Sequence, residues 1–555
     1  QTMSLSQTNP FPGLKHSPLS SNEAQQFLSF VAEHKNLTYK ETTYSDLPSL
    51  RDTAFANVSF TVHDVKIKAK GPDDIIYGST NERKVPQNAK IRDLITRGCF
   101  MIQVKDEKEQ KDLYWNLFQG FCKFSGMTDE DDDDLSQLKE NKQKRNPPKR
   151  IRETTKINVE DDTIEEVVEV EESDQVEDII EELNEDTVLS QQKNKAKKDP
   201  YFLAPYTESI KMVHTRKENG KACHLAVFDL VHHGEAVRLY VSGSKNVHFV
   251  FRNESDLQQY KDTLLHVKAA RSMLKMLAEM DSDKARIFED VLSENGLVAN
   301  FEYMLADEQH IVDYQLQDHL ARLLGITGRR INNDEYREQH GKCINPRKVI
   351  EWGRLLGVPV AEVCKEFDFT QETLNTLIKE VRVEEQSEGS VIYFVDKDDR
   401  VIGLWKLKSQ WYILFRAIRE KLVRFSTTFN KDVKKRLKAI KSWIGLSDDE
   451  VAKWRITASY LYDYHLELMR SNQLQGHRDS VRADFAVNLR KFLEQFRLPD
   501  DVLVAVDELP EEHELSGLTL MVPKTLERQQ QQPQTKGDGR KGGKRKHRKR
   551  RHRGQ

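Results

Sequence analysis

The stretch Lys217-Glu218-Asn219-Gly220, followed by the apolar run Ala222 to Val231, organises the rest of this chain. A lysine three residues before a glycine is weak evidence by itself, because such tetrapeptides occur by chance in charged turns. Five further segments follow it in order. They are Ser242-Gly243-Ser244-Lys245-Asn246, Asn300-Phe301-Glu302-Tyr303, Glu308-Gln309-His310, Glu388-Gly389-Ser390-Val391-Ile392 and Trp405-Lys406-Leu407-Lys408. The ordered series, rather than any one member, is the signal.

The composition indicates a chain that is only partly folded into globular structure. Of the 555 residues, 37% are hydrophobic and 32% are charged, which is too polar for globular structure throughout. The net charge of -3 hides a strong segregation of charge, with an acidic block after Thr128 and a basic block at the C-terminus. We therefore predict long solvated segments beside the folded part.

Two segments are predicted to be disordered. Residues 129–198 combine the acidic run 131–134, the basic run 142–152 and a second acidic stretch up to Asp186, with few aromatic residues. Such a composition cannot bury enough apolar surface to offset the entropy of ordering the chain. The basic run is either a nuclear import signal or a solvated charge run. The tail 525–555, rich in Gln and then in Lys and Arg, is either an RNA anchor or an import signal.

The cysteines favour a reducing compartment. They are Cys99, Cys122, Cys223, Cys343 and Cys364. They are far apart and form no C-x-x-C pair, so they indicate neither a zinc site nor a disulfide framework. No apolar run approaches the roughly 18 residues of a membrane span, and the start of the sequence has no signal-peptide pattern. We predict a soluble intracellular protein, nuclear or cytoplasmic, with no membrane partner.

The segment Val401–Lys408 predicts a strand that carries two lysines on one face. Alternation places Lys406 and Lys408 on one side and Trp405 and Leu407 on the other. Two ammonium groups on an otherwise apolar strand are costly unless they meet an anion. A bound phosphate group would be such an anion. The structural alternative is that both lysines protect the edge of a sheet.

Lys217 and two glutamates are the candidates for chemistry. A free lysine titrates near about 10.4, so a nucleophilic lysine needs desolvation or nearby cations to become neutral. Glu302 lies within an apolar run, where a charge is rarely left unpaired. Glu388 precedes Gly389, which permits close backbone approach, and its carboxylate can hold a divalent cation. The structural alternatives are a turn lysine and a strand-end ion pair.

The ordered series resembles the motifs of the covalent nucleotidyltransferases, and most closely the ATP-dependent RNA ligases of the tRNA ligase and phage RNA ligase 1 group. The segments Glu308-Gln309-His310 and Arg419-Glu420 are similar to those of tRNA ligases. The resemblance implies an α+β ligase fold of antiparallel sheets around an ATP groove, with Lys217 as the nucleophile. It also implies nucleotide contacts for Arg97, Lys123, Glu302, Lys406 and Lys408, nucleotide or RNA positioning by Ser244 and Lys245, and metal binding by Glu388 and Glu302.

Two segments upstream of the nucleophile fit this resemblance. We predict short strands at Thr96–Phe100 and Phe118–Phe124, and similar Arg-Gly-apolar and Gly-aromatic-x-Lys-Phe-Phe segments precede the nucleophile in these ligases. The likeness implies that Arg97 and Lys123 reach the ATP phosphates. Ser125 departs from the family, which commonly has a second aromatic residue there. The structural alternative for both cations is a surface position beside core aromatics.

The last third of the chain predicts a small helical module. Val433, Leu437 and Ile440 recur at helical spacing, and Ser447-x-x-Glu450 is typical of a capping box. The lysines of the first of these helices either bind RNA or form a solvated face. The predicted domains are 1–128 for the N-terminal part of the ligase domain, 129–198 for the insertion, 199–425 for the nucleotidyltransferase core, 426–505 for the helical module and 525–555 for the tail.

The predicted function is ATP-dependent RNA ligation, with ATP and Mg2+ as cofactors. By family analogy, Lys217 attacks the α-phosphate of ATP, AMP passes to an RNA 5′-phosphate, and a 3′-hydroxyl displaces AMP. The alternatives are an mRNA-capping-type guanylyltransferase and a non-catalytic RNA-binding scaffold. The sequence has no kinase P-loop and no paired His-x-Ser/Thr motifs. We therefore expect an RNA partner with 5′-phosphate and 3′-hydroxyl ends, and a separate end-healing kinase and phosphodiesterase.

Overall fold

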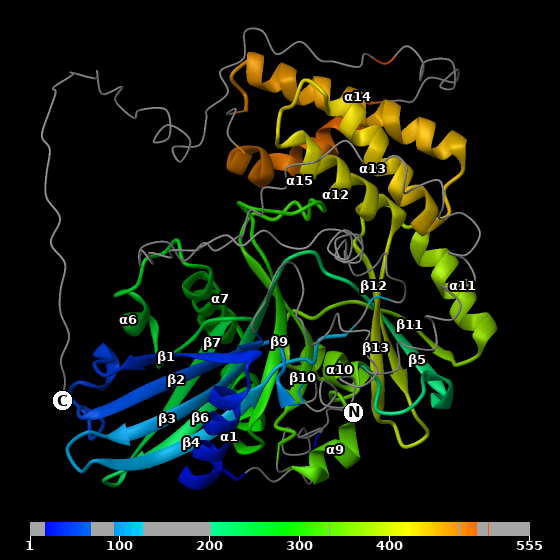
Figure 1. Cartoon of the computed structure of the whole chain (residues 1–555). Coiled ribbons are helices and arrows are strands. Elements are labelled where there is room, and N and C mark those ends of the chain that lie inside the picture. The colour runs from blue at the N-terminus through cyan, green and yellow to red at the C-terminus, as the bar shows by residue number, and fades with distance from the viewer. Residues whose placement is uncertain are drawn as a thin grey trace, which may run out of the picture.

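The computed structural model describes residues 11, 17–67, 91, 94–124, 126, 201–331, 333–474, 478–496 and 509. The predicted disordered segments, 129–198 and 525–555, lie outside the described residues, as does Ser125. Three antiparallel sheets and a group of helices at one end make up the described part (Figure 1). Among the helices that the structure describes, none is both long and apolar enough to span a bilayer.

The first sheet comes from the N-terminal segment. Its strands, in sheet order, are β1 (Leu37–Tyr44), β2 (Val58–Ile67), β3 (Cys99–Asp106) and β4 (Lys111–Gln119). Helix α1 (Ser21–Glu33) begins with a capping box at Ser20 and buries Phe27 and Leu28 against this sheet.

The two cation-bearing segments before the insertion are loops for most of their length, contrary to the prediction. β3 begins only after Gly98, whose φ of 68° interrupts the extended backbone. β4 ends at Gln119, and beyond it the amide of Phe121 donates to the side chain of Asn300. Because Cys99 pairs with Gln119 in the antiparallel ladder, the two loops lie side by side.

The second sheet has the apolar run after Gly220 at its centre. Its strands, in sheet order, are β10 (Leu320–Gly328), β9 (Leu297–Met304), β6 (Lys221–His232), β7 (Glu235–Ser244) and β8 (His248–Phe251). The associated helices are α6 (Glu254–Leu257), α7 (Leu265–Glu279), α8 (Ser282–Glu294), α9 (Asp334–His340) and α10 (Pro346–Leu356). One face of the sheet shares a core with the first sheet, and the other packs on α7, α8 and α10.

The third sheet carries the strand with the two lysines. Its order is β11 (Val363–Asp368), β5 (Lys211–Arg216), β12 (Gly389–Val395) and β13 (Val401–Lys408), and α11 (Gln371–Arg382) covers one face. Trp405 and Leu407 pack in the cluster that includes α11, whereas Leu404 packs in the cluster on the opposite face. The predicted alternation along β13 is confirmed.

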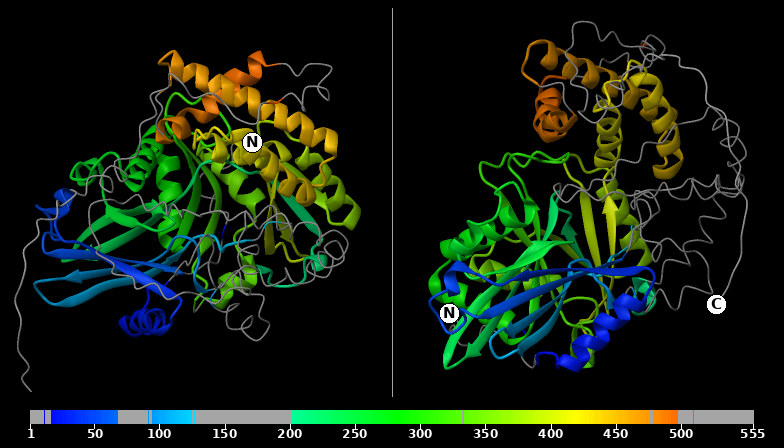
Figure 2. Two further views of the ribbon diagram at one scale, coloured as in Figure 1. Left: turned by 45° about the horizontal axis from the view of Figure 1, so that its top comes forward. Right: turned by 60° about the vertical axis from the view of Figure 1, so that its left-hand side comes forward.

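Four helices form the helical group at the end of the described chain (Figure 2). They are α12 (Gln410–Leu422), α13 (Phe429–Ile444), α14 (Asp448–Arg470) and α15 (Arg478–Gln495). The predicted capping box at Ser447 and the buried positions Val433, Leu437 and Ile440 are confirmed. The core of this group also takes in Ile311 from the loop after β9. The structure also describes 3-10 turns at Pro48–Leu50 and Tyr206–Glu208.

We predict that Tyr462→Ala destabilises the helical group by about 3–5 kcal/mol, as expected for removal of a large buried aromatic side chain. Tyr462 is 0% exposed, stacks on Phe429 at 4.2 Å, and donates to the backbone oxygen of Ser426. Tyr460 on the same helix is 46% exposed and serves as the matched control. Urea unfolding followed by circular dichroism should show a large loss of unfolding free energy for Tyr462→Ala only. Equal losses of unfolding free energy in the two variants would contradict the packing described.

Candidate active site around Lys217

The tetrapeptide that contains Lys217 crosses from the third sheet to the second. It follows β5, and the amide of Lys217 donates to the backbone oxygen of Gly389 at 2.8 Å. Gly220 then enters β6 beside β9, where a Cβ atom would lie 2.5 Å from the carbonyl oxygen of Tyr303. Its amide donates to the Glu302 carboxylate at 3.0 Å. A glycine is required here because the backbone itself passes against β9.

The side chain of Lys217 forms an ion pair with Glu388. Lys217 Nζ lies 2.5 Å from Glu388 Oε1, and the two side chains are 21% and 7% exposed. The other carboxylate oxygen of Glu388 accepts a hydrogen bond from Asn219 Nδ2 at 2.7 Å. Gly389, at a φ of 119°, lets the backbone pass close to β13 at Leu407. Two predicted site residues, the nucleophile and the carboxylate after it, are therefore brought into direct contact.

Glu302 is the second carboxylate near Lys217. Burial raises the pKa of Glu302 to about 7, and the negative charges of Glu388 and Glu218 act in the same direction. The ammonium of Lys217 and the amide of Gly220 oppose this shift. Because its pKa is close to neutral, Glu302 changes its charge in the pH range in which the protein would work.

Asn219 links the site to the loop that follows β9. Its buried side-chain oxygen accepts hydrogen bonds from the amides of Ile311 and Val312 at 3.0 and 3.3 Å. Its own amide donates to the hydroxyl of Tyr314 at 2.6 Å. Our sequence analysis did not include Asn219 among the site residues, because within the tetrapeptide it resembled an ordinary turn residue. The structure shows that it bridges Glu388 and this loop.

Glu218 was also missed, since a carboxylate next to a turn lysine carries no special signal. It is only 2% exposed and accepts a hydrogen bond from Arg322 of β10 at 2.7 Å. The guanidinium of Arg322 lies 5.8 Å from the ring centroid of Tyr314. This ion pair ties the tetrapeptide to the edge strand of the second sheet.

The two lysines of β13 differ in their surroundings. Lys408 is 3% exposed, pairs with Gly389 in the strand register, and places Nζ 5.7 Å from the ring centroid of Tyr412. Lys406 is half-buried and forms an isolated β-bridge with Gly126. Lys408 therefore lies beside the motif that contains Glu388, while Lys406 lies beside the segment that carries Lys123.

The remaining predicted residues gather on neighbouring loops. The amide of Arg97 donates to Phe121 O at 2.9 Å, and the amide of Gly98 donates to Lys245 O at 3.2 Å. Arg97 and Lys245 are exposed, whereas Lys123 is half-buried. Ser244 is half-buried, and its Oγ accepts a hydrogen bond from the amide of Asn246. The described contacts thus join the loops of Arg97, Lys123 and Lys245, and group Glu302, Glu388 and Lys408 around Lys217.

A buried polar chain lies beneath these loops. His248 Nδ1 lies 2.6 Å from Asp64 Oδ1, and His248 Nε2 lies 3.3 Å from His224 Nδ1. Burial, and then the nearby His248, lower the pKa of His224 to about 3, so its ring is neutral. Gly98 and Gly120 both pack against this ring, in places where a side chain would collide with it. The chain therefore supports the backbone that carries Arg97 and Lys123.

The segment Glu308-Gln309-His310 contacts α12. Arg419 donates to the backbone oxygen of His310 at 3.1 Å, and Lys221 Nζ lies 2.9 Å from the Glu308 carboxylate. Burial, followed by the Arg419 cation, lowers the pKa of His310 to about 4. The two segments that resemble tRNA ligases outside the main motifs thus touch one another.

We predict that Glu302→Gln stabilises the protein at alkaline pH. The pKa of Glu302 is about 7 in the folded state against the usual 4.5, so the folded state holds this proton more tightly. The corresponding stabilisation is fully present below about pH 4.5 and is lost as the pH rises through about 7. Glutamine stays neutral and can still accept from Gly220. It should therefore raise Tm by about 2–4 °C at pH 8.5, with no difference near pH 5.

The matched control for this prediction is Glu308→Gln. Glu308 is about half exposed, and its variant should leave Tm within about 1 °C at either pH. Differential scanning fluorimetry at both pH values provides the measurement. A Glu302→Gln protein with the Tm of the wild type at pH 8.5 would contradict the assigned protonation.

Comparisons with known proteins give one family match and several similar structures. The family model described as "Domain of unknown function (DUF7920)" matches residues 179–419, which is less than half of the 555-residue chain. No curated protein matches the sequence.

The solved structures that resemble the chain include ATP-dependent RNA ligases. One crystal form of an archaeal ATP-dependent RNA ligase is 15% identical, with a TM-score of 0.30 over 54% of this chain and 74% of that one. A Naegleria gruberi RNA ligase mutant with ATP and Mn is 10% identical, with a TM-score of 0.24 over 38% of this chain and 52% of that one. The chain thus spans about half the length of the Naegleria ligase. Similarity at this level assigns no activity, so any assignment depends on the residues of the site.

Proposed function

We propose that this protein is an ATP-dependent RNA ligase that joins RNA 5′-phosphate and 3′-hydroxyl ends through a lysyl-AMP intermediate. The observation that carries the proposal is the contact between Lys217 and Glu388, with Glu302 and the buried Lys408 beside it. A structural ion pair alone would need one carboxylate. Two carboxylates and a second buried lysine at one strand junction favour a site that handles phosphates and a cation.

Lys217 is the proposed nucleophile. In the ligand-free protein the carboxylate of Glu388 stabilises its ammonium form, and attack requires the neutral amine. Glu388 and Glu302 would hold a cation, and the neighbouring charge of Lys408 would favour loss of the Lys217 proton to solvent. Nζ then attacks the α-phosphorus of ATP, a P–N bond forms, and the bond to the leaving pyrophosphate breaks.

Glu388 and Glu302 are the residues that would hold Mg2+. Both present carboxylate oxygens, the ligands that Mg2+ prefers. The ion would supply positive charge to the phosphates and to the leaving pyrophosphate. The protein's own cations, Lys408 and Lys406 on β13 and Lys123 on the adjacent loop, would bind the phosphate oxygens.

The next two steps use RNA. An oxygen of the RNA 5′-phosphate attacks the adenylate, which breaks the P–N bond and restores the amine of Lys217. A 3′-hydroxyl then attacks the activated 5′-phosphate and releases AMP. Arg97, Ser244 and Lys245 are proposed to position nucleotide or RNA, and end-healing reactions are assigned to separate enzymes.

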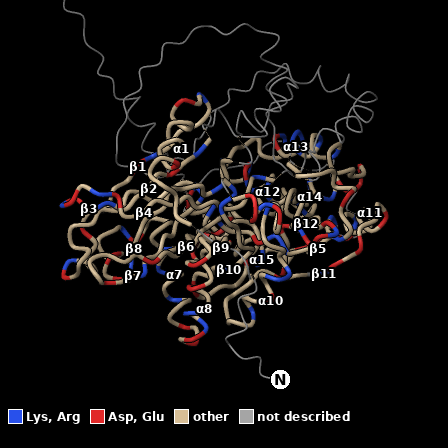
Figure 3. Tube along the Cα trace, turned by 90° about the horizontal axis from the view of Figure 1, so that it is seen from below, with Lys and Arg blue, Asp and Glu red and all other residues tan. Residues whose placement is uncertain are grey.

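The helical group offers a basic face for the RNA backbone. Figure 3 shows Lys and Arg along α13. The exposed lysines on this helix are Lys431, Lys434, Lys435 and Lys438. Exposed lysines contact phosphates without reading sequence, so this face would contribute salt-dependent affinity. The proposed architecture is one catalytic domain from residues 1–128 and 199–425, followed by the helical module 426–505.

We predict that Lys217→Ala and Lys217→Arg both abolish covalent labelling by α-labelled ATP, because neither offers a neutral amine at pH 7. The matched control is Lys211→Ala on β5, which removes a lysine that pairs with Glu366 at the other end of the same strand. Labelling of the Lys217→Ala protein would contradict the assignment. Labelling of the wild type by GTP but not by ATP would indicate a capping-type guanylyltransferase instead.

We predict that Lys408→Ala lowers the rate of adenylation by about 100-fold, the usual effect of removing one preorganised cation or donor from a phosphate site. Its Tm should stay close to that of the wild type, since the change also removes a buried charge. The control is Lys397→Ala, whose side chain is 80% exposed in the β12–β13 turn. A rate for Lys408→Ala within about twofold of the control would show that Lys408 does not face the nucleotide.

A further inference from the structure

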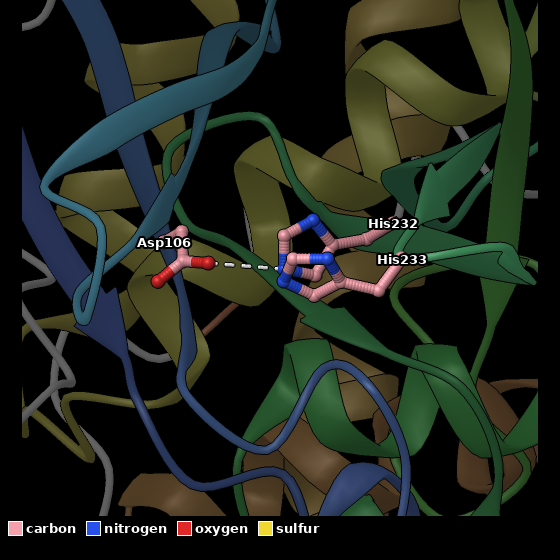
Figure 4. Close-up of side chains that lie close together, drawn as sticks. All are labelled: Asp106, His232 and His233. Atoms are coloured by element: carbon pink, nitrogen blue, oxygen red, sulfur yellow. Dashed lines mark ion pairs between the residues drawn. The ribbon is translucent and has the colours of Figure 1, made fainter.

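The hairpin between β6 and β7 meets the end of β3 at one edge of the two packed sheets. Figure 4 shows Asp106 pointing toward the rings of His232 and His233. One potential ligand atom from each of the three residues lies within 4.8 Å of the others. Asp106 precedes the insertion 129–198 and the histidines follow it, so the cluster joins the two parts of the chain that the insertion separates.

The hairpin turn brings two consecutive histidines together. Successive residues of a strand point to opposite faces, so neighbouring side chains do not usually meet. Here His233 and Gly234 take positive φ values of 48° and 85° between β6 and β7. The rings of His232 and His233 consequently lie with their centroids 4.0 Å apart. A two-residue turn with positive φ at both positions usually has Asn or Gly at the first, and histidine is among the other residues enriched at positive φ.

Asp106 is held in a single orientation. Its Oδ1 accepts hydrogen bonds from the amides of Lys108 and Glu109 at 2.8 and 2.9 Å, which leaves Oδ2 to face His232 Nε2 at 3.0 Å. Metal-binding carboxylates are typically oriented by hydrogen bonds to one oxygen, while the other oxygen faces the ion.

We propose that Asp106, His232 and His233 bind one divalent transition metal ion, of which Zn2+ is the representative. Zinc binds nitrogen and carboxylate ligands at about 2.0–2.2 Å, so two ligands of a tetrahedral site are about 3.3 Å apart. The separation of 3.0 Å between Asp106 and His232 already fits this value. The side chain of His233 is 59% exposed and can rotate into place. Glu109 Oε1 lies 3.6 Å from His233 Nε2 but outside the three-residue cluster, so Glu109 or water would complete the site.

The ligand types select the ion. Two imidazoles and carboxylates suit Zn2+, Cu2+ or Ni2+, whereas Mg2+ and Ca2+ prefer oxygen ligands alone. The site is distinct from the proposed active site, because β6 starts next to Lys217 and ends at His232, about 35 Å away at the usual rise per residue. The bound ion would crosslink the β3–β4 turn to the β6–β7 hairpin and so hold the first sheet on the second.

The test is Zn2+ binding to the full chain, measured by competition with a chromophoric chelator. The wild type should bind one Zn2+ at this site. The affinity for Zn2+ should be at least about 10-fold lower in His233→Gln and in Asp106→Asn. His233 is exposed, and asparagine at position 106 can still accept from both amides, so both variants should fold. His34→Gln serves as a control for loss of a histidine away from the cluster.

Thermal stability gives a second readout. Zn2+ at a concentration well above its Kd should raise the Tm of the wild type and of His34→Gln by several degrees, and that of His233→Gln and Asp106→Asn by clearly less. Labelling by ATP with Mg2+ should continue in His233→Gln. Equal Zn2+ affinity and equal Tm shifts for wild type, His233→Gln and Asp106→Asn would overturn the site.

Discussion

The ion pair between Lys217 and Glu388 is the interaction on which the arrangement of the site depends. It joins a residue between two sheets to a residue at the start of β12, and both side chains are largely buried. A buried charge is tolerated only with a partner, so the two sheets must meet where these charges meet. Two hydrogen bonds stabilise the same junction. The backbone amide of Lys217 donates to the carbonyl oxygen of Gly389, and the side-chain amide of Asn219 donates to the Glu388 carboxylate. The two sheets are thus held together by charged and polar contacts at this junction.

The helical group takes part in this junction. Its core includes Ile311 and Val312 of the loop after β9, and the amides of the same two residues donate to Asn219. Ser409, the N-cap residue of α12, directly follows Lys408, and Tyr412 of this helix lies beside that lysine. The helical group therefore contacts Asn219 and Lys408, two residues beside Lys217.

The first two sheets share a single core, although the insertion separates them in sequence. Residues from β2, β3 and β4 pack with residues from β6, β7 and β9 in one cluster. At one edge of this sandwich the chain Asp64–His248–His224 supports the loops of the proposed phosphate cations. At another, Asp106 meets His232. Both polar contacts connect residues on opposite sides of the insertion.

The local features of this protein follow from its sequence. The alternation along Val401–Lys408, the helical spacing of Val433 and Leu437, and the capping box at Ser447 all follow from the burial and hydrogen bonding of nearby residues, and the structure confirms each. The order of the motifs also indicated that Lys217 and Glu388 belong together, and they are in contact.

The contacts between distant residues depend on how the sheets and loops pack, which local patterns do not show. In the sequence Asn219 resembles a turn residue. In the structure its side-chain oxygen accepts a hydrogen bond from the amide of Ile311, which lies 92 residues further along the chain. Glu302 acquired its pKa of about 7 from burial among groups on three different segments. The loops of Arg97 and Lys123 were predicted to be strands. Periodicity does not show the positive φ of Gly98 or the hydrogen bond from the Phe121 amide to the side chain of Asn300. Periodicity reports the burial of a segment, whereas contacts between segments depend on how the sheets pack.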